Sequence, residues 1–164
     1  MTSLIGTAHV YGDNVDTDRI IPGKYTKTLD LSDLAQHVLE DLDPDFSSRV
    51  RPGDILVAGD NFGAGSSREQ APVALKAVGV SAVVANYFAR IFYRNAINIG
   101  LPVLEVGTHK IQMGHEVEID LDRGLVIDRS TQEIYEATQM PQVMVRILAS
   151  GGLVNFLREH GNYV

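Results

Sequence analysis

Apolar residues between positions 50 and 105 fall into short continuous runs that alternate with segments of helical spacing. Three of these runs are short enough to be buried strands, at residues 54–58, 81–85 and 101–104. Two segments between them repeat apolar side chains every three or four positions and end near glycine, as helices do, at residues 66–78 and 87–97. This strand–helix–strand–helix–strand order predicts an α/β layer with parallel strands.

The flanking segments predict antiparallel strands and further helices. Residues 116–121 alternate apolar and polar positions, and a turn leads from them into residues 125–127, so we expect a hairpin. A further strand is expected at residues 7–11, and further helices at residues 31–42, 141–149 and 153–160. The helix at 31–42 has Asp30 or Ser32 as its candidate N-cap. Because there is no internal repeat or linker, we expect residues 1–164 to form one domain with a mixed sheet.

Composition narrows the classes of function. The 164 residues include no cysteine, which excludes disulfides, a thiol nucleophile and an iron–sulfur cluster held by this chain's own thiolates. The formal net charge of −7 disfavours nucleic acid and anionic membranes as partners, because both bind basic surfaces. No apolar run approaches the roughly 18 residues of a membrane span, and the N-terminus lacks the pattern of a signal peptide. We therefore expect a cytoplasmic protein.

The glycine-rich loop at residues 61–65 is the first candidate for chemistry. It is not a phosphate-binding P-loop, and Arg68 stands where the dinucleotide-binding fingerprint needs a third glycine. Ser66 and Glu69 have the spacing of a capping box, which would make the serine only a helix cap. Alternatively, a Ser66 alkoxide at the helix start would be stabilised by the helix dipole, by backbone N–H groups and by Arg68. The residues alone leave both interpretations open.

Two other groups of charged residues have competing interpretations. Residues 13–18 are rich in aspartate but lack the glycine and closing glutamate of a calcium loop, so they form either a solvated turn or acids that orient an arginine or histidine. Arg90 and Arg94 share one helix face, which suggests an anion or acid between them, or only a solvated edge. The five histidines are scattered without metal-ligand spacing, and we expect no metal site in this chain.

Three motifs, in order along residues 6–105, resemble the swivelling domain of the aconitase superfamily. Within that superfamily they are most similar to the small subunits of 3-isopropylmalate dehydratases. The motifs are GDNVDTDRIIP at 12–22, GDNFGAGSSRE at 59–69 and FARIFYRN at 88–95. The C-terminal third carries less of this signature and is placed by continuity.

The resemblance implies a three-layer β/β/α swivelling fold and a hydro-lyase that isomerises 2-isopropylmalate and 3-isopropylmalate by dehydration and rehydration, in leucine biosynthesis. It also implies a large partner subunit that holds the 4Fe–4S cluster, without which this chain would be inactive. By the same resemblance, Ser66 is the catalytic base that removes a proton next to a carboxylate. The other residues that it implicates are Gly65, Ser67 and Arg68 in substrate binding, with Asp18, Thr17 and Arg90 in support.

Substrate choice depends on the segment after Pro22, which resembles the specificity loop of this family. Lys27 lies near the position where isopropylmalate-specific subunits have an apolar residue and tricarboxylate-specific subunits an arginine. A lysine could bind a distal carboxylate, or turn its charge to solvent and lay its methylene stem against an alkyl group. We expect isopropylmalate. Homoaconitate, another substituted malate, or a non-enzymatic anion-binding module are the alternatives, and the polar loop at residues 23–29 is expected to be mobile.

Overall fold

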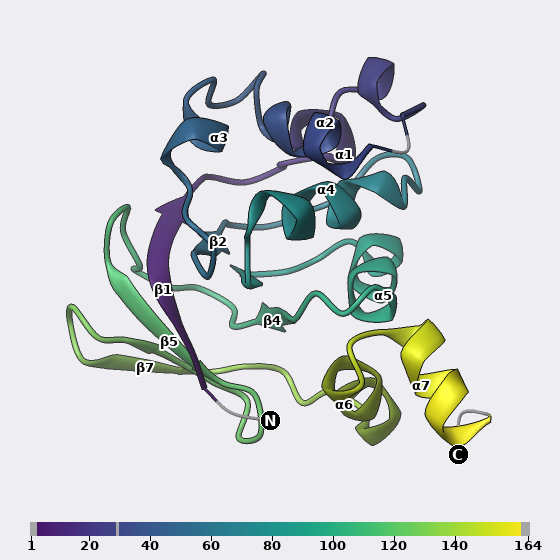
Figure 1. The fold of residues 1–164 in the computed structure, drawn as a ribbon. Helices are drawn as coiled ribbons and strands as arrows, with labels where there is room; N and C mark the ends of the chain where they lie inside the picture. The colour runs from purple at the N-terminus through teal and green to yellow at the C-terminus, as the bar shows by residue number, and fades with distance from the viewer. Residues whose placement is uncertain (1–2, 29, 162–164) are drawn as a thin grey trace.

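The computed structural model describes residues 3–28 and 30–161, which contain a seven-stranded mixed sheet (Figure 1). The strand order is β4-β3-β2-β1-β5-β6-β7. The strands are β1 Ser3–Val10, β2 Ile55–Val57, β3 Ala82–Ala85, β4 Val103–Glu105, β5 Glu116–Asp120, β6 Leu125–Asp128 and β7 Glu133–Glu136. Strands β1 to β4 are parallel, whereas β5 to β7 are antiparallel. The expected hairpin is β5 and β6.

Short helices connect these strands and follow them. They are α1 Thr17–Ile20, the 3-10 helix η1 Gly23–Tyr25, α2 Leu31–Gln36, α3 Phe46–Arg49, α4 Gln70–Val78, α5 Arg90–Asn98, α6 Gln142–Ala149 and α7 Leu153–His160. Within the described ranges, no helix combines the length and the apolar character that a membrane crossing would require.

The parallel strands are buried on both faces, which divides the core in two. On β2, Leu56 packs in the core beneath the helices, whereas its neighbours Ile55 and Val57 pack against the antiparallel strands. In Figure 1, α4 and α5 lie on one side of the parallel strands, and β5 and β7 curl away on the other. The layers are therefore helices, parallel sheet and antiparallel sheet, the β/β/α arrangement that the resemblance implied.

Strand β1 joins the two parts of the sheet. Its last three residues pair with β2 in parallel, while residues 3–7 pair with β5 in antiparallel register. The sheet bends along this one strand, so the antiparallel layer can fold over the parallel layer and enclose the second core.

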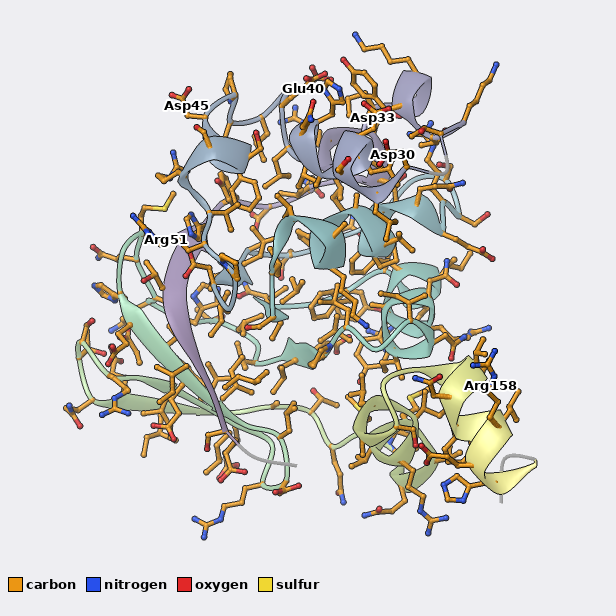
Figure 2. All side chains as sticks on the ribbon, in the orientation of Figure 1. Asp30, Asp33, Glu40, Asp45, Arg51 and Arg158 are labelled. Carbon is orange, nitrogen blue, oxygen red and sulfur yellow. The ribbon has the colours of Figure 1, made fainter. Side chains whose placement is uncertain are left out.

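Several helix boundaries differ from the predictions. The helix expected at residues 31–42 ends at Gln36. Leu39 adopts a left-handed conformation (φ 58°) and its N–H bonds to Ile20 O at 2.9 Å, so tertiary contacts end the helix early. Its N-cap is Asp30, whose Oδ1 accepts a hydrogen bond from Ser32 N at 3.0 Å (Figure 2). The helix expected at 87–97 begins at Arg90, and the short elements α1, α3 and β7 were not predicted.

Candidate functional site

The three motifs meet at one edge of the parallel sheet. Parallel strands direct their carboxyl ends the same way, so the loops that follow β1, β2 and β3 lie side by side. Backbone hydrogen bonds join these loops, from Thr17 N to Ala64 O (2.8 Å) and from Phe62 N to Tyr87 O (3.1 Å). Residues that are far apart in sequence are thereby held together at this edge.

Ser66 is exposed in the loop between β2 and α4. Its Oγ lies 3.2 Å from Oγ1 of Thr17, which is buried. Gly65 has a φ of +101°, and a Cβ at this position would lie 3.3 Å from the same Thr17 oxygen. Glycine therefore suits the turn that brings the two hydroxyls together.

The predicted helix at residues 66–78 is wrong at its start, because α4 begins only at Gln70. Glu69 is the N-cap and no side chain caps the helix, so the capping box of Ser66 and Glu69 does not form. Arg68 likewise precedes the helix rather than lying in its first turn. Ser66 therefore does not lie in the first turn of α4, where the helix dipole acts most strongly.

Asp18 orients Arg68 within this loop. An Nη1 hydrogen of Arg68 is donated to the Asp18 carboxylate, and Nη1 also lies 3.2 Å from Ile21 O. The Arg68 side chain is only a quarter exposed. Gly23 borders the guanidinium so closely that a Cβ there would lie 3.0 Å from Nη2. Of the two interpretations of the aspartate-rich segment, the structure supports acids that orient an arginine.

The other aspartates of that segment bind backbone groups. Asp16 caps α1 by accepting a hydrogen bond from Arg19 N at 2.9 Å, and Asp13 Oδ1 accepts one from Asp60 N at 2.7 Å. No cluster of three or more histidine, cysteine, aspartate or glutamate residues suited to a metal ion occurs in the described part of the chain.

Arg90 and Arg94 have different environments. Arg90 donates a hydrogen bond to the buried Glu105 carboxylate at the end of β4 and lies over the rings of Tyr87 and Tyr93, 4.9 and 5.1 Å from their centroids. Burial raises the pKa of Tyr93, and the charge of Glu105 raises it further. Arg94 is exposed, and its side chain has no hydrogen bond or ion pair with any described residue. Glu105 Oε1 accepts hydrogen bonds from Arg90 and from Phe88 N (3.4 Å) but none from Arg94, so among the described residues no acid bridges the two arginines.

Comparison with known proteins identifies the family. The model for the Aconitase C-terminal domain matches residues 43–108. The 3-isopropylmalate dehydratase small subunit of Nautilia profundicola is 52% identical over 160 residues, covering 97% of this chain and 96% of that protein. This chain belongs to the 3-isopropylmalate dehydratase small-subunit family.

Two more relatives bear on the fold and on substrate range within this family. A crystal structure of a 3-isopropylmalate dehydratase from Methanocaldococcus jannaschii superposes with a TM-score of 0.92 at 46% identity, covering 97% of this chain and 95% of that one. The predicted fold class is therefore confirmed. The 2,3-dimethylmalate dehydratase small subunit of Eubacterium barkeri is 54% identical over 154 residues, covering 93% of this chain and 94% of that protein. Close relatives in this family thus carry names for different substituted malates.

The segment that resembles the family's specificity loop lies beside the start of α4. Gln70 Nε2 donates a hydrogen bond to Thr26 O at 3.3 Å, and the Tyr25 ring stacks on His37 with centroids 3.6 Å apart. Lys27 is exposed and makes no hydrogen bond or ion pair with the residues that the structure describes. The expected mobility of residues 23–29 stays a prediction, and Leu29 lies outside the described residues.

Sequence reasoning named Ser66, Arg68, Asp18 and Thr17 but missed how they are held. It overlooked Gly23, although a glycine directly after Pro22 was a signal that something approaches the backbone there. The contact between this glycine and the Arg68 guanidinium joins segments 45 positions apart, so no local pattern reveals it.

Proposed function

We propose that this chain is the small subunit of a heteromeric hydro-lyase that interconverts 2-isopropylmalate and 3-isopropylmalate in leucine biosynthesis. The observation that supports this most is the exposed Ser66 hydroxyl in the same loop as Arg68, whose guanidinium is oriented by Asp18. These residues come from the motifs at 12–22 and 59–69. The chain that carries them is 52% identical to a 3-isopropylmalate dehydratase small subunit over nearly its full length. In this proposal residues 1–164 act as one swivelling domain.

Ser66 acts as the base in this proposal. Its Oγ takes the proton from the carbon next to a substrate carboxylate, which a free serine hydroxyl does poorly because it is a weak base. Before this step the Ser66 hydroxyl gives its own proton to solvent water, and the Arg68 cation, two residues away in the sequence, favours the alkoxide that results. General-base catalysis of this kind contributes about 10²–10⁴-fold to the rate.

Ser67 and Arg68 bind the substrate carboxylate. Within the described residues, the backbone N–H groups of Ser67 and Arg68 have no hydrogen-bond acceptor, and the Ser67 side chain is exposed and unbonded. Free N–H groups beside a guanidinium suit a carboxylate, since such charge-assisted hydrogen bonds are the strong ones. Gly65 contributes to substrate binding through the turn that presents these groups, since its φ of +101° favours glycine.

The 4Fe–4S cluster belongs to the large subunit in this proposal. Such clusters are held by cysteine thiolates, and the sequence of this chain has none. When bound in the partner, the cluster supplies a Lewis acid that polarises the leaving hydroxyl group. This chain supplies the proton acceptor and the carboxylate contacts, so neither subunit is active alone.

Replacing Ser66 tests the proposal. In the assembled enzyme, Ser66→Ala should lower kcat by about 10²–10⁴-fold because it removes the base. Turnover is followed by the ultraviolet absorbance of the alkene intermediate, and assembly with the large subunit by size-exclusion chromatography. Ser48→Ala on α3 is the matched control and should keep full activity, because among the described residues the Ser48 hydroxyl bonds only to Asp45 O. Full activity of Ser66→Ala would show that the base is another group.

The isolated chain distinguishes this enzyme from an anion-binding module on the same fold. Calorimetry of the isolated chain with 2-isopropylmalate should detect no binding, because the substrate also needs the partner's iron. Binding in the absence of the large subunit would favour the non-enzymatic function instead.

Lys27 favours a second candidate function, in which the substrate has an additional carboxylate, as homoaconitate does. Its ammonium is exposed and unpaired within the described residues, and the carbonyl of the preceding Thr26 accepts a hydrogen bond from Gln70 at the start of α4. Under our main proposal, 2-isopropylmalate has a higher kcat/KM than 2,3-dimethylmalate or homoaconitate, and Lys27→Leu changes that value by less than about threefold. Under the alternative, homoaconitate is preferred and Lys27→Leu lowers its kcat/KM by about 10–100-fold. Lys24→Leu on η1 is the matched control.

A further inference from the structure

Thr17 and Ser66 form a contact between two hydroxyls that the two motifs bring together. The Thr17 Oγ1 and the Ser66 Oγ are 3.2 Å apart, although the residues are 49 positions apart in sequence. Thr17 is only 3% exposed, whereas Ser66 is exposed at the surface of the loop. The buried Thr17 hydroxyl thus contacts the accessible Ser66 hydroxyl from the inside of the loop.

The surroundings of Thr17 fix the position of its backbone. Its backbone N–H donates to Ala64 O at 2.8 Å and its carbonyl accepts from Ile21 N at 3.0 Å. The residue therefore has its position set from both sides, by the Ser66 loop and by α1. Because threonine is branched at Cβ, few χ1 rotamers are available to it. Gly65 leaves the space in which the contact forms, since a Cβ there would lie 3.3 Å from Oγ1.

From this geometry we infer that Thr17 is a positioning residue that donates its hydroxyl hydrogen to Ser66 and aims the serine at the open face of the loop. This inference rests on the proposed function. When Ser66 is neutral, either hydroxyl can donate. When Ser66 has lost its proton, its Oγ can only accept, and a hydrogen bond to a charged oxygen is stronger than one to a neutral oxygen.

Thr17 therefore stabilises the reactive form of Ser66 more than its resting form. The substrate proton goes to Ser66 Oγ, and Thr17 keeps its own proton throughout. Thr17 thus adds a hydrogen-bond donor to the Arg68 guanidinium and the free backbone N–H groups of the loop, all of which favour an alkoxide.

The test compares Thr17→Val with Thr17→Ser in the assembled enzyme. Valine keeps the shape of threonine but lacks the hydroxyl, so kcat should fall about 10–100-fold while KM changes by less than about twofold. Thr17→Ser retains the donor and should keep kcat within about threefold of the original chain. Thr131→Val is the matched control, because the Thr131 hydroxyl, as far as the structure describes the chain, bonds only to Glu133 N near the turn between β6 and β7. It should be fully active.

A second measurement reports on Ser66 directly. In a crystal structure of Thr17→Val, the Ser66 side chain should occupy more than one rotamer, whereas Thr17→Ser should retain the single one. A Thr17→Val enzyme with unchanged kcat and one unchanged Ser66 rotamer would overturn the positioning role. So would a Thr17→Ser enzyme as slow as Thr17→Val, because the threonine would then matter for its methyl packing.

These outcomes separate the inference from the function on which it rests. If Ser66→Ala is inactive while Thr17→Val is fully active, the positioning role fails and the base assignment stands. If Ser66→Ala is fully active, the proposed role of Ser66 fails whatever the Thr17 variants do.

Discussion

At the scale of single residues, two glycines of the loop before α4 are needed for different reasons. Gly63 has a φ of +82°, and a Cβ there would come within 2.5 Å of Phe92 Cβ on α5. Gly65 has a φ of +101°, and its nearest neighbour would be the Thr17 hydroxyl at 3.3 Å. Gly63 therefore serves the packing of the loop against α5, whereas Gly65 serves the contact at the site.

Gly63→Ala should lower the free energy of unfolding by about 2–4 kcal/mol, because left-handed strain and overpacking against Phe92 add. Gly107→Ala is the matched control. Gly107 has a φ of +67° and open space around its Cβ position, so only the strain of about 1–2 kcal/mol applies. Urea denaturation of the isolated chain measures both values. Equal losses at the two positions would mean that the loop moves away from Phe92 without cost.

At the scale of elements, the three-layer arrangement makes strands such as β2 and β3 apolar on both faces. Ile55 of β2 is fully buried between the parallel and antiparallel layers, whereas Ile134 of β7 is 61% exposed. Period-two alternation is visible in β5, which has one open face, but is hidden in β2, where every residue is apolar.

Replacing isoleucine by alanine on β2 and on β7 measures how much the burial of each side chain contributes to stability. Ile55→Ala should destabilise the chain by about 2–5 kcal/mol, because it opens a cavity in the second core. Ile134→Ala should change the free energy of unfolding by less than about 0.5 kcal/mol, since the side chain is mostly in solvent. The measurement is again urea denaturation. A small effect at Ile55 would contradict a closed core between the two sheet layers.

The bounds of the helices show where the pattern of neighbouring residues no longer predicts the structure. The helix Leu153–His160 has the predicted bounds, because apolar spacing and flanking glycines act within the segment itself. The start of α4 was predicted four residues too early. Ser66 and Arg68 satisfy a helix-start pattern, but their side chains bond to Thr17 and Asp18 instead. Partners from a distant segment outweigh a cap that contributes only about 1 kcal/mol.

At the scale of the whole molecule, the fold class was predictable from the sequence. The apolar runs predicted the parallel strands. The chemical role of the Gly-Ser-Ser-Arg loop stays a prediction, although Ser66 and Arg68 of this loop contact Thr17 and Asp18 of another motif. The side-chain contacts between the motifs were not predictable from the sequence in the same way. Asp18 was recognised only as an acid that orients some arginine or histidine, and Arg90 was grouped with Arg94, although its partner is Glu105 on β4.

By itself, the sequence determined which segments are strands and helices, which side chains are apolar enough to be buried, and which loop carries the serine and the arginine. These properties depend on neighbours along the chain. Only the tertiary structure decided that a threonine on α1 meets Ser66, that Asp18 binds Arg68, and that α4 begins after the reactive loop. Those contacts join residues about 50 positions apart, and they form because parallel strands bring the ends of successive loops to one edge of the sheet.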